Sequence, residues 1–204
     1  AARGAGIVRL SGGTFMAGTI WLKSNVELRV EEDAVLLGSP NLDDYNEEDA
    51  FVQNYGSKRE GWAAKHMVIA LEATNVAITG KGVIDGNSAA YFDESKVSRC
   101  FIGKAGWRFG GFRPGERGEV LRPGQELLFT QCKGVRIEDV TIRNMCCWTC
   151  VFYGSEHVRV GRVKVRNGFR HLNTDAFDID CCHDVKIGDC DIVTGDDAFA
   201  IRGD

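Results

Sequence analysis

The chain has 204 residues, of which 44% are apolar and 26% charged, and its formal net charge at pH 7 is -4. This length suits a single domain with a sizeable core, and the weak negative charge excludes a general attraction to nucleic acid or anionic membranes. No stretch approaches the roughly 20 apolar residues of a membrane span, so we expect neither a nucleic-acid nor a membrane partner.

Both ends of the chain lack the features of a complete protein. Residues 1–6 hold no apolar run after a basic start, so they are not a signal peptide. At the other end, residues 201–204 follow a strand-like pattern without any closing element. We therefore expect residues 1–204 to form a single domain that is a fragment, incomplete at its C-terminal side and also at its N-terminal side.

One template of apolar positions, V-x-I/V-x-x-V/C-x-I/V, recurs along the chain. The first and weakest copy has Val76, Ile78 and Val83, with Lys81 where the third apolar residue is expected. Three stronger copies follow: Val135, Ile137, Val140, Ile142; Val158, Val160, Val163, Val165; and Val185, Ile187, Cys190, Ile192. The alternation within each half predicts short β-strands with one buried face.

A further apolar pair precedes each strong copy, namely Leu127/Phe129, Cys150/Phe152 and Phe177/Ile179. A unit therefore holds about three short strands, and such units bury a face only when they are stacked. The predicted fold class is all-β, and a parallel β-helix fits these units better than a propeller. A β-sandwich with coincidental periodicity is the alternative.

Residues 92–126 interrupt the repeat and are predicted to form an inserted loop. The stretch from Gly106 to Gly115 reads G-W-R-F-G-G-F-R-P-G, which is typical of loops. Seven basic and two acidic residues lie between positions 95 and 122, so the segment could bind an anionic substrate. Arg108 and Arg113 are its candidate substrate-binding residues, although a solvated loop explains the same charges.

Two segments near the C-terminal end carry aspartates in matching positions. Asn173-Thr174-Asp175 precedes Phe177, and Gly195-Asp196-Asp197 precedes Phe199 one repeat later. One coil of a β-helix advances by about 4.8 Å, so Asp175, Asp196 and Asp197 should lie together. Carboxylates this close raise one another's pKa values. A protonated member can act as general acid while ionised neighbours act as base or nucleophile, which glycosidic hydrolysis requires.

Several other residues have simpler interpretations. Clustered aspartates can also bind Ca²⁺ through their oxygens. Asp178, Asp180, Asp184, Asp189 and Asp191 are predicted to be solvated, and His157, His171 and His183 are predicted to be surface residues of loops. The eight cysteines are predicted to be mainly small buried hydrophobes, with a disulfide framework or a metal site as alternatives.

The quoted motifs resemble glycoside hydrolase family 28, the polygalacturonases and their relatives. Asn173-Thr174-Asp175 matches the N-T-D motif of that family and Gly195-Asp196-Asp197 its G-D-D motif. Residues 18–26, 78–86 and 140–144, with Trp148-Thr149 after the last, resemble its early coils. The resemblance implies a right-handed parallel β-helix and inverting hydrolysis of α-glycosidic bonds in pectin. It implies that Asp196 is the general acid and that Asp175 and Asp197 activate water. Asn173 and Arg202 are candidate substrate-binding residues, and no cofactor or metal is expected.

The chain departs from the family pattern in three places. Ala176 stands where the family usually has glycine, and Ala198 where it often has cysteine. The later G-H-G histidine and R-x-K pair have no match within 204 residues, so we expect the isolated chain to be inactive and the parent enzyme to be active. Coil spacing of about 4.8 Å also lies nearer the carboxyl separation of retaining enzymes than that of inverting ones.

The expected partner is a polysaccharide or oligosaccharide, with acidic pectin as the default, and the expected state is a monomer. A rhamnogalacturonan-directed or exo-acting hydrolase of the same family is an alternative. A Ca²⁺-dependent polysaccharide lyase and a non-catalytic β-helix binding module are alternatives of other classes. Such a hydrolase is expected to be secreted or periplasmic, with a cytoplasmic enzyme that degrades imported oligosaccharides as the alternative.

Overall fold

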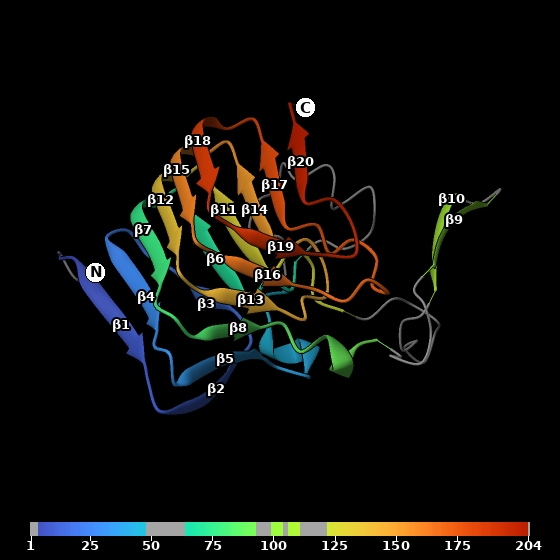
Figure 1. Cartoon of the computed structure of the whole chain (residues 1–204), viewed down its shortest axis with the longest axis horizontal. Coiled ribbons are helices and arrows are strands. Elements are labelled where there is room, and N and C mark those ends of the chain that lie inside the picture. Colours follow the sequence, from blue (N-terminus) through green and yellow to red (C-terminus); the bar gives the residue numbers. More distant parts are fainter. Residues whose placement is uncertain (1–3, 48–63, 93–98, 104–105, 111–121, 204) are drawn as a thin grey trace.

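The computed structural model describes residues 4–47, 64–92, 99–103, 106–110 and 122–203. Within these residues the chain forms three parallel six-stranded sheets and one two-stranded antiparallel sheet. Successive strands visit the three sheets in turn, so the chain winds in stacked coils (Figure 1). Connections that return to a neighbouring parallel strand are right-handed. The fold is therefore a right-handed parallel β-helix, as predicted.

The strands of the three sheets pair in chain order. The first sheet holds β1 (Gly6–Leu10), β4 (Val26–Val30), β7 (Thr74–Thr79), β12 (Lys133–Glu138), β15 (Glu156–Gly161) and β18 (His183–Gly188). The second holds β2 (Gly13–Ala17), β5 (Ala34–Gly38), β8 (Val83–Asp85), β13 (Thr141–Arg143), β16 (Lys164–Arg166) and β19 (Asp191–Val193). The third holds β3 (Ile20–Trp21), β6 (Val68–Leu71), β11 (Leu127–Thr130), β14 (Cys150–Tyr153), β17 (Phe177–Asp180) and β20 (Phe199–Arg202). Two short 3-10 helices, η1 (Leu42–Asp44) and η2 (Ser88–Ala90), lie between the second and third sheets.

The strong copies of the apolar template lie in the predicted register. Val135 pairs with Val158, and Val158 pairs with Val185, across β12, β15 and β18. Inward side chains from all three sheets meet in one continuous core. Within that core the rings of Phe129 and Phe152 stack with centroids 5.5 Å apart. Stacking of equivalent side chains on successive coils therefore holds the helix together.

For the weak copy of the template, the predicted register is wrong by one residue in its second strand. Val83 pairs with Thr141 and is half-buried, whereas Ile84 pairs with Ile142 and is fully buried. The turn at 80–82 is one residue longer than the equivalent turn at 139–140, and a shift of one residue reverses which face of a strand is buried. Gly82 makes this turn possible, because a Cβ there would lie 2.2 Å from the carbonyl oxygen of Glu31.

Variation in the length of the coils is concentrated at one corner of the helix. The connections from the first to the second sheet span residues 11–12, 31–33, 80–82, 139–140, 162–163 and 189–190. The connections from the second to the third sheet span residues 18–19, 39–67, 86–126, 144–149, 167–176 and 194–198. We call this second set the long corner. All three predicted catalytic aspartates belong to it.

Part of the predicted insertion at 92–126 is described. Strands β9 (Arg99–Gly103) and β10 (Gly106–Gly110) form an antiparallel hairpin that belongs to none of the three parallel sheets (Figure 1). The prediction that the whole stretch from Gly106 is loop is therefore wrong for 106–110. Residues 93–98, 104–105 and 111–121 lie outside the described residues, so the extent of the inserted loop and the single-domain boundaries stay predictions.

The cysteines mostly pack as predicted. Cys132, Cys146, Cys147 and Cys150 are buried free thiols, and burial raises the pKa of the Cys132 thiol to about 11. Cys181 is exposed, which the prediction of buried cysteines did not anticipate. In the described part of the chain, no helix combines the length and the apolar character needed to cross a membrane.

Candidate active site

The long corner brings Asp175, Asp196 and Asp197 together on adjacent coils. Phe177 pairs with Phe199, and the backbone N–H of Ala176 donates to the carbonyl oxygen of Asp197 at 2.9 Å. One carboxylate oxygen from each of the three aspartates lies within 4.8 Å of the other two. We call these three residues the carboxylate trio. Their proximity follows the predicted register, while their catalytic role stays a prediction.

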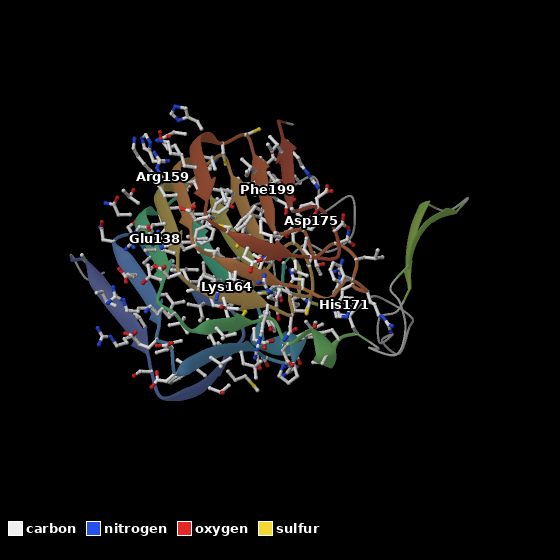
Figure 2. The ribbon with its side chains drawn as sticks, in the orientation of Figure 1. Glu138, Arg159, Lys164, His171, Asp175 and Phe199 are labelled. Atoms are coloured by element: carbon white, nitrogen blue, oxygen red, sulfur yellow. The ribbon has the colours of Figure 1, made fainter. Side chains whose placement is uncertain are left out.

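The three carboxylates differ in exposure. Asp175 is only 5% exposed, whereas Asp196 and Asp197 are exposed. Burial is the main cause that raises the pKa of Asp175 to about 7, and the charge of Asp196 and then that of Asp197 raise it further. Near neutral pH the trio can therefore both hold a proton and accept one. Figure 2 shows Asp175 and His171 on one side of the coils, away from Glu138 and Arg159 of the first sheet.

Two backbone N–H groups orient the carboxylate of Asp196. Asn173 donates to Oδ2 and Asp197 donates to Oδ1, each at 3.0 Å. Asn173 was predicted to bind substrate, and in the structure its backbone holds a member of the trio. A role of its side chain in substrate binding stays a prediction.

The G-D-D turn packs closely on the N-T-D turn of the preceding coil. The N–H of Gly195 donates to Oγ1 of Thr174 at 3.2 Å, and the hydroxyl of Thr194 donates to the carbonyl oxygen of Thr174. A Cβ on Gly195 would lie 2.4 Å from the carbonyl oxygen of His171 and 2.6 Å from that of Gly168. Glycine is therefore required by space at this turn, and the close approach positions Asp196 and Asp197.

Arg202 lies over an aromatic ring beside a buried acid. Its guanidinium carbon is 4.3 Å from the ring centroid of Trp148, and its Nη2 is 3.8 Å from Oδ1 of Asp178. Asp178 is 1% exposed, and among the described residues neither of its carboxylate oxygens has a hydrogen-bond partner. Burial first, and the charge of Asp175 next, raise the pKa of Asp178 well above its usual range. A cation and a buried acid with a raised pKa therefore lie next to the trio.

Two predictions about isolated polar residues are wrong. Asp178 and Asp180 are buried, because the outward face of the third sheet is itself covered: Leu128 and Val151, which share a column with Asp178, are also buried. His171 is 4% exposed and stacks on Phe92 with ring centroids 4.0 Å apart.

The remaining residues of that group are not buried. The structure shows Asp184 half-buried and Asp189, Asp191, His157 and His183 exposed. The predicted exposure of these four residues is confirmed. His157 lies in β15 and His183 in β18, however, so the prediction that these two histidines lie in loops is wrong.

The basic residues of the insertion have different outcomes. Arg108 lies in β10, where the structure describes the backbone only, and Arg113 lies outside the described residues. Arg122, counted only as one of seven cations of this segment, is buried. Its Nη1 donates to the carbonyl oxygen of Cys146 and its Nη2 to Oδ1 of Asn173 at 3.3 Å. The only sequence signal for this role is that Arg122 stands shortly before the apolar run of β11.

Two other features of the surface bear on the choice of site. A shallow groove of about 680 Å³ lies over the first sheet, but no member of the trio lines it and its Glu27 and Arg136 already form an ion pair at 3.1 Å. The trio itself could contact a cation. It would supply only part of the six to eight oxygen ligands that Ca²⁺ takes.

The family described as glycosyl hydrolases family 28 has a model that matches residues 24–204. A protein named probable polygalacturonase from Vitis vinifera is 26% identical over 194 residues, which cover 93% of this chain and 35% of that protein. A protein named exo-poly-alpha-D-galacturonosidase from Dickeya chrysanthemi is 28% identical over 213 residues, covering 92% of this chain and 35% of that protein.

Among solved structures, a hyperthermoactive exopolygalacturonase from Thermotoga maritima matches with a TM-score of 0.74 at 26% identity, covering 98% of this chain and 47% of that one. The chain thus spans about a third of the length of these two curated relatives and about half of this structure.

Proposed function

Because this chain belongs to glycosyl hydrolases family 28, we propose that the protein containing it hydrolyses the α-glycosidic bonds of pectin as a polygalacturonase. The observation that carries the proposal is the carboxylate trio, whose members lie within 4.8 Å of one another and include one buried acid with a raised pKa. The names of the relatives, which include both exo- and endo-acting polygalacturonases, support the same substrate class.

The reaction needs a proton donor and a proton acceptor at the scissile bond. In the proposed mechanism Asp196 protonates the glycosidic oxygen as the bond from that oxygen to the anomeric carbon breaks. Asp175 and Asp197 take a proton from the water whose oxygen attacks that carbon. The raised pKa of Asp175 supports a second possibility within the trio, in which the proton first resides on Asp175 and moves to Asp196 when the substrate binds.

The stereochemistry of the reaction is part of the proposal. The nearest carboxylate oxygens of the trio are within 4.8 Å, which is shorter than the roughly 6.5–9.5 Å between carboxyl groups of inverting enzymes. We nevertheless propose inversion, as the family resemblance implies, because these are nearest-atom distances and rotation of a side chain changes them by several Å. The anomer formed first, observed by NMR during hydrolysis, distinguishes inversion from retention.

Arg202 is proposed to bind the carboxylate of an acidic sugar. Its side chain is 31% exposed, and Trp148 fixes the plane of its guanidinium, so some N–H groups remain available to a ligand. Arg108 and Arg113 are proposed to contribute further positive charge. Because pectin lies outside the cytoplasm, we also propose that the protein is secreted or periplasmic. We propose further that it acts as a monomer.

The test uses the full-length natural protein with polygalacturonic acid, with and without a chelator, and follows reducing ends and ultraviolet absorbance together. Reducing ends without new absorbance, unaffected by the chelator, are the expected result. Chelator-sensitive absorbance would instead indicate a lyase that uses a cation at the trio.

Hydrolysis of rhamnogalacturonan but not polygalacturonate would correct the substrate, and no product from either polymer would favour a binding module. The sizes of the products separate exo from endo action. The isolated 204-residue chain is expected to be inactive in the same assays.

A further inference from the structure

Three successive turns of the long corner are linked through polar contacts. Cys146 lies in the turn at 144–149, Asn173 in the turn at 167–176 and Asp196 in the turn at 194–198. The guanidinium of Arg122 donates to the carbonyl oxygen of Cys146 and to Oδ1 of Asn173, the latter at 3.3 Å. A planar guanidinium suits this task because its N–H groups point in fixed directions. Arg122 thus ties the first of these turns to the second.

Asn173 passes this link on to the third turn. Its φ of 56° lies in the left-handed region, which residues other than glycine adopt infrequently. In this conformation the backbone N–H of Asn173 donates to Oδ2 of Asp196 at 3.0 Å. One residue therefore receives a hydrogen bond from Arg122 on its side chain and gives one to Asp196 from its backbone.

The exposure of these residues indicates which of them needs support. Asp196 is exposed, so side-chain packing does not hold its carboxylate, and backbone N–H donors at 173 and 197 orient it. Arg122 is only 5% exposed, so packing fixes its position. The buried cation has a fixed position and the exposed carboxylate does not, so hydrogen bonds that connect the two can position the carboxylate.

We propose that Arg122 is a positioning residue for Asp196, acting through Asn173, in the hydrolysis described above. Arg122 does not touch the trio in this scheme. It holds Asn173 in the conformation that presents its N–H to Asp196, and so keeps Asp196 directed toward Asp175 and Asp197. The inference rests on the proposed function for its kinetic consequences, whereas the link itself is a property of the fold.

The test is a double-mutant cycle in the full-length protein with Arg122→Gln and Asn173→Gly. Glycine at 173 tolerates the positive φ and removes the side chain that receives the bond from Arg122. Each single variant is expected to lower kcat on polygalacturonate about tenfold or more while KM changes less than about twofold, since an orientation needed in the transition state is lost. The kcat of the double variant is expected to equal that of the less active single variant, because both substitutions break the same link.

A matched control and a fallback variant keep the test decisive. Arg162→Gln removes an exposed arginine that pairs with Asp139 at 2.7 Å on another corner, and it should leave kcat unchanged. Should Arg122→Gln fail to fold, Arg122→Lys retains the charge but not the planar fork and takes its place in the cycle. Multiplicative losses of kcat in the double variant, or full activity of folded Arg122→Gln, would overturn the proposal.

Failure of the proposed function is distinguishable from failure of this link. If the wild-type protein hydrolyses none of the polymers, the proposed function is wrong and kcat cannot be used. Denaturant midpoints of the same four proteins then form a second cycle, which requires no activity. Non-additive midpoints would support the link between Arg122 and Asn173, and additive midpoints would overturn it.

Discussion

The backbone N–H of Ala176 donates a 2.9 Å hydrogen bond to the carbonyl oxygen of Asp197. This bond joins two connections of the long corner just before the ladder that pairs β17 with β20, so the spacing of neighbouring strands also sets the separation of Asp175 from the aspartate pair of the next coil. The backbone therefore fixes the positions of the three aspartates, so the effects of changing individual side chains on activity and on stability are expected to be separable.

Asp175→Asn is expected to stabilise the fold at alkaline pH. The pKa of Asp175 is about 7 in the folded chain and about 3.9 in an unfolded one, so the folded state holds the extra proton between these values. Stability is therefore lost as pH rises from about 4 through 7. Asparagine carries no charge and should add about 2–4 kcal/mol to the free energy of unfolding at pH 8 but little at pH 4.

Urea unfolding at the two pH values measures this difference. Asp189→Asn, at an exposed aspartate, is the matched control and should change the free energy of unfolding by less than about 0.5 kcal/mol. An equal effect of Asp175→Asn at pH 4 and pH 8 would contradict the raised pKa. The same variant should lose hydrolytic activity, which would separate the role of Asp175 in the site from its contribution to stability.

Asp196→Asn is expected to lower the rate of hydrolysis about 10²–10⁴-fold, the usual effect of removing a general acid. It should also lower the pKa of Asp175, because the charge of Asp196 is the largest contribution to that pKa after burial. Carbon-13 NMR titration of the Asp175 carboxyl group measures the second effect. Asp191→Asn, which removes an exposed partner of Arg166, should change neither quantity. An unchanged titration of Asp175 would show that the two carboxylates do not interact.

Gly195→Ala is expected to lower activity strongly. The added Cβ would lie 2.4 Å from the carbonyl oxygen of His171, so the turn that carries Asp196 must move. Gly188→Ala, at the end of β18 in the same coil, provides a control, because no atom lies within 4 Å of a Cβ built there. Assays of reducing ends for both variants, with thermal unfolding, test the expectation. Full activity of Gly195→Ala would mean that the turn tolerates displacement.

Ile84→Ala and Val83→Ala test the register of β8. Ile84 is fully buried and its truncation is expected to cost about 2–5 kcal/mol in the free energy of unfolding. Val83 is half-buried on the opposite face, so its truncation should cost less than about 1 kcal/mol. Denaturant unfolding of the two variants measures the difference. A larger loss of stability at Val83 than at Ile84 would instead support the register predicted from the weak copy of the template.

The repeated apolar positions could be predicted because they express a local rule. Alternate residues of a strand face the core, and equal spacing between copies places Val135, Val158 and Val185 in one column. The same counting placed Asp175 and Asp197 on adjacent coils. It failed at Val83 because one additional residue in a glycine-containing turn changes the facing of the next strand without changing the apolar pattern.

Burial of polar residues could not be read in the same way. Asp178 stands at an outward position, and only the structure shows that the outward face of the third sheet is covered there. His171 and Arg122 lie in connections, and their contacts with Phe92 and Asn173 join segments that are distant in the sequence. Alternation along a strand carries no information about such contacts, so the trio was predicted while the residues that support it were not.

The uneven lengths of the connections have a consequence for how such a protein can change over generations. The first-to-second connections span two or three residues in every coil, whereas the long corner ranges from residues 18–19 to residues 86–126. Insertions and deletions at this corner leave the pairing of the ladders intact, since each sheet keeps its register on both sides. Lineages that share one scaffold can therefore acquire new substrate preferences by exchanging whole corner segments, and chimaeras made at these boundaries should inherit the preference of the donor.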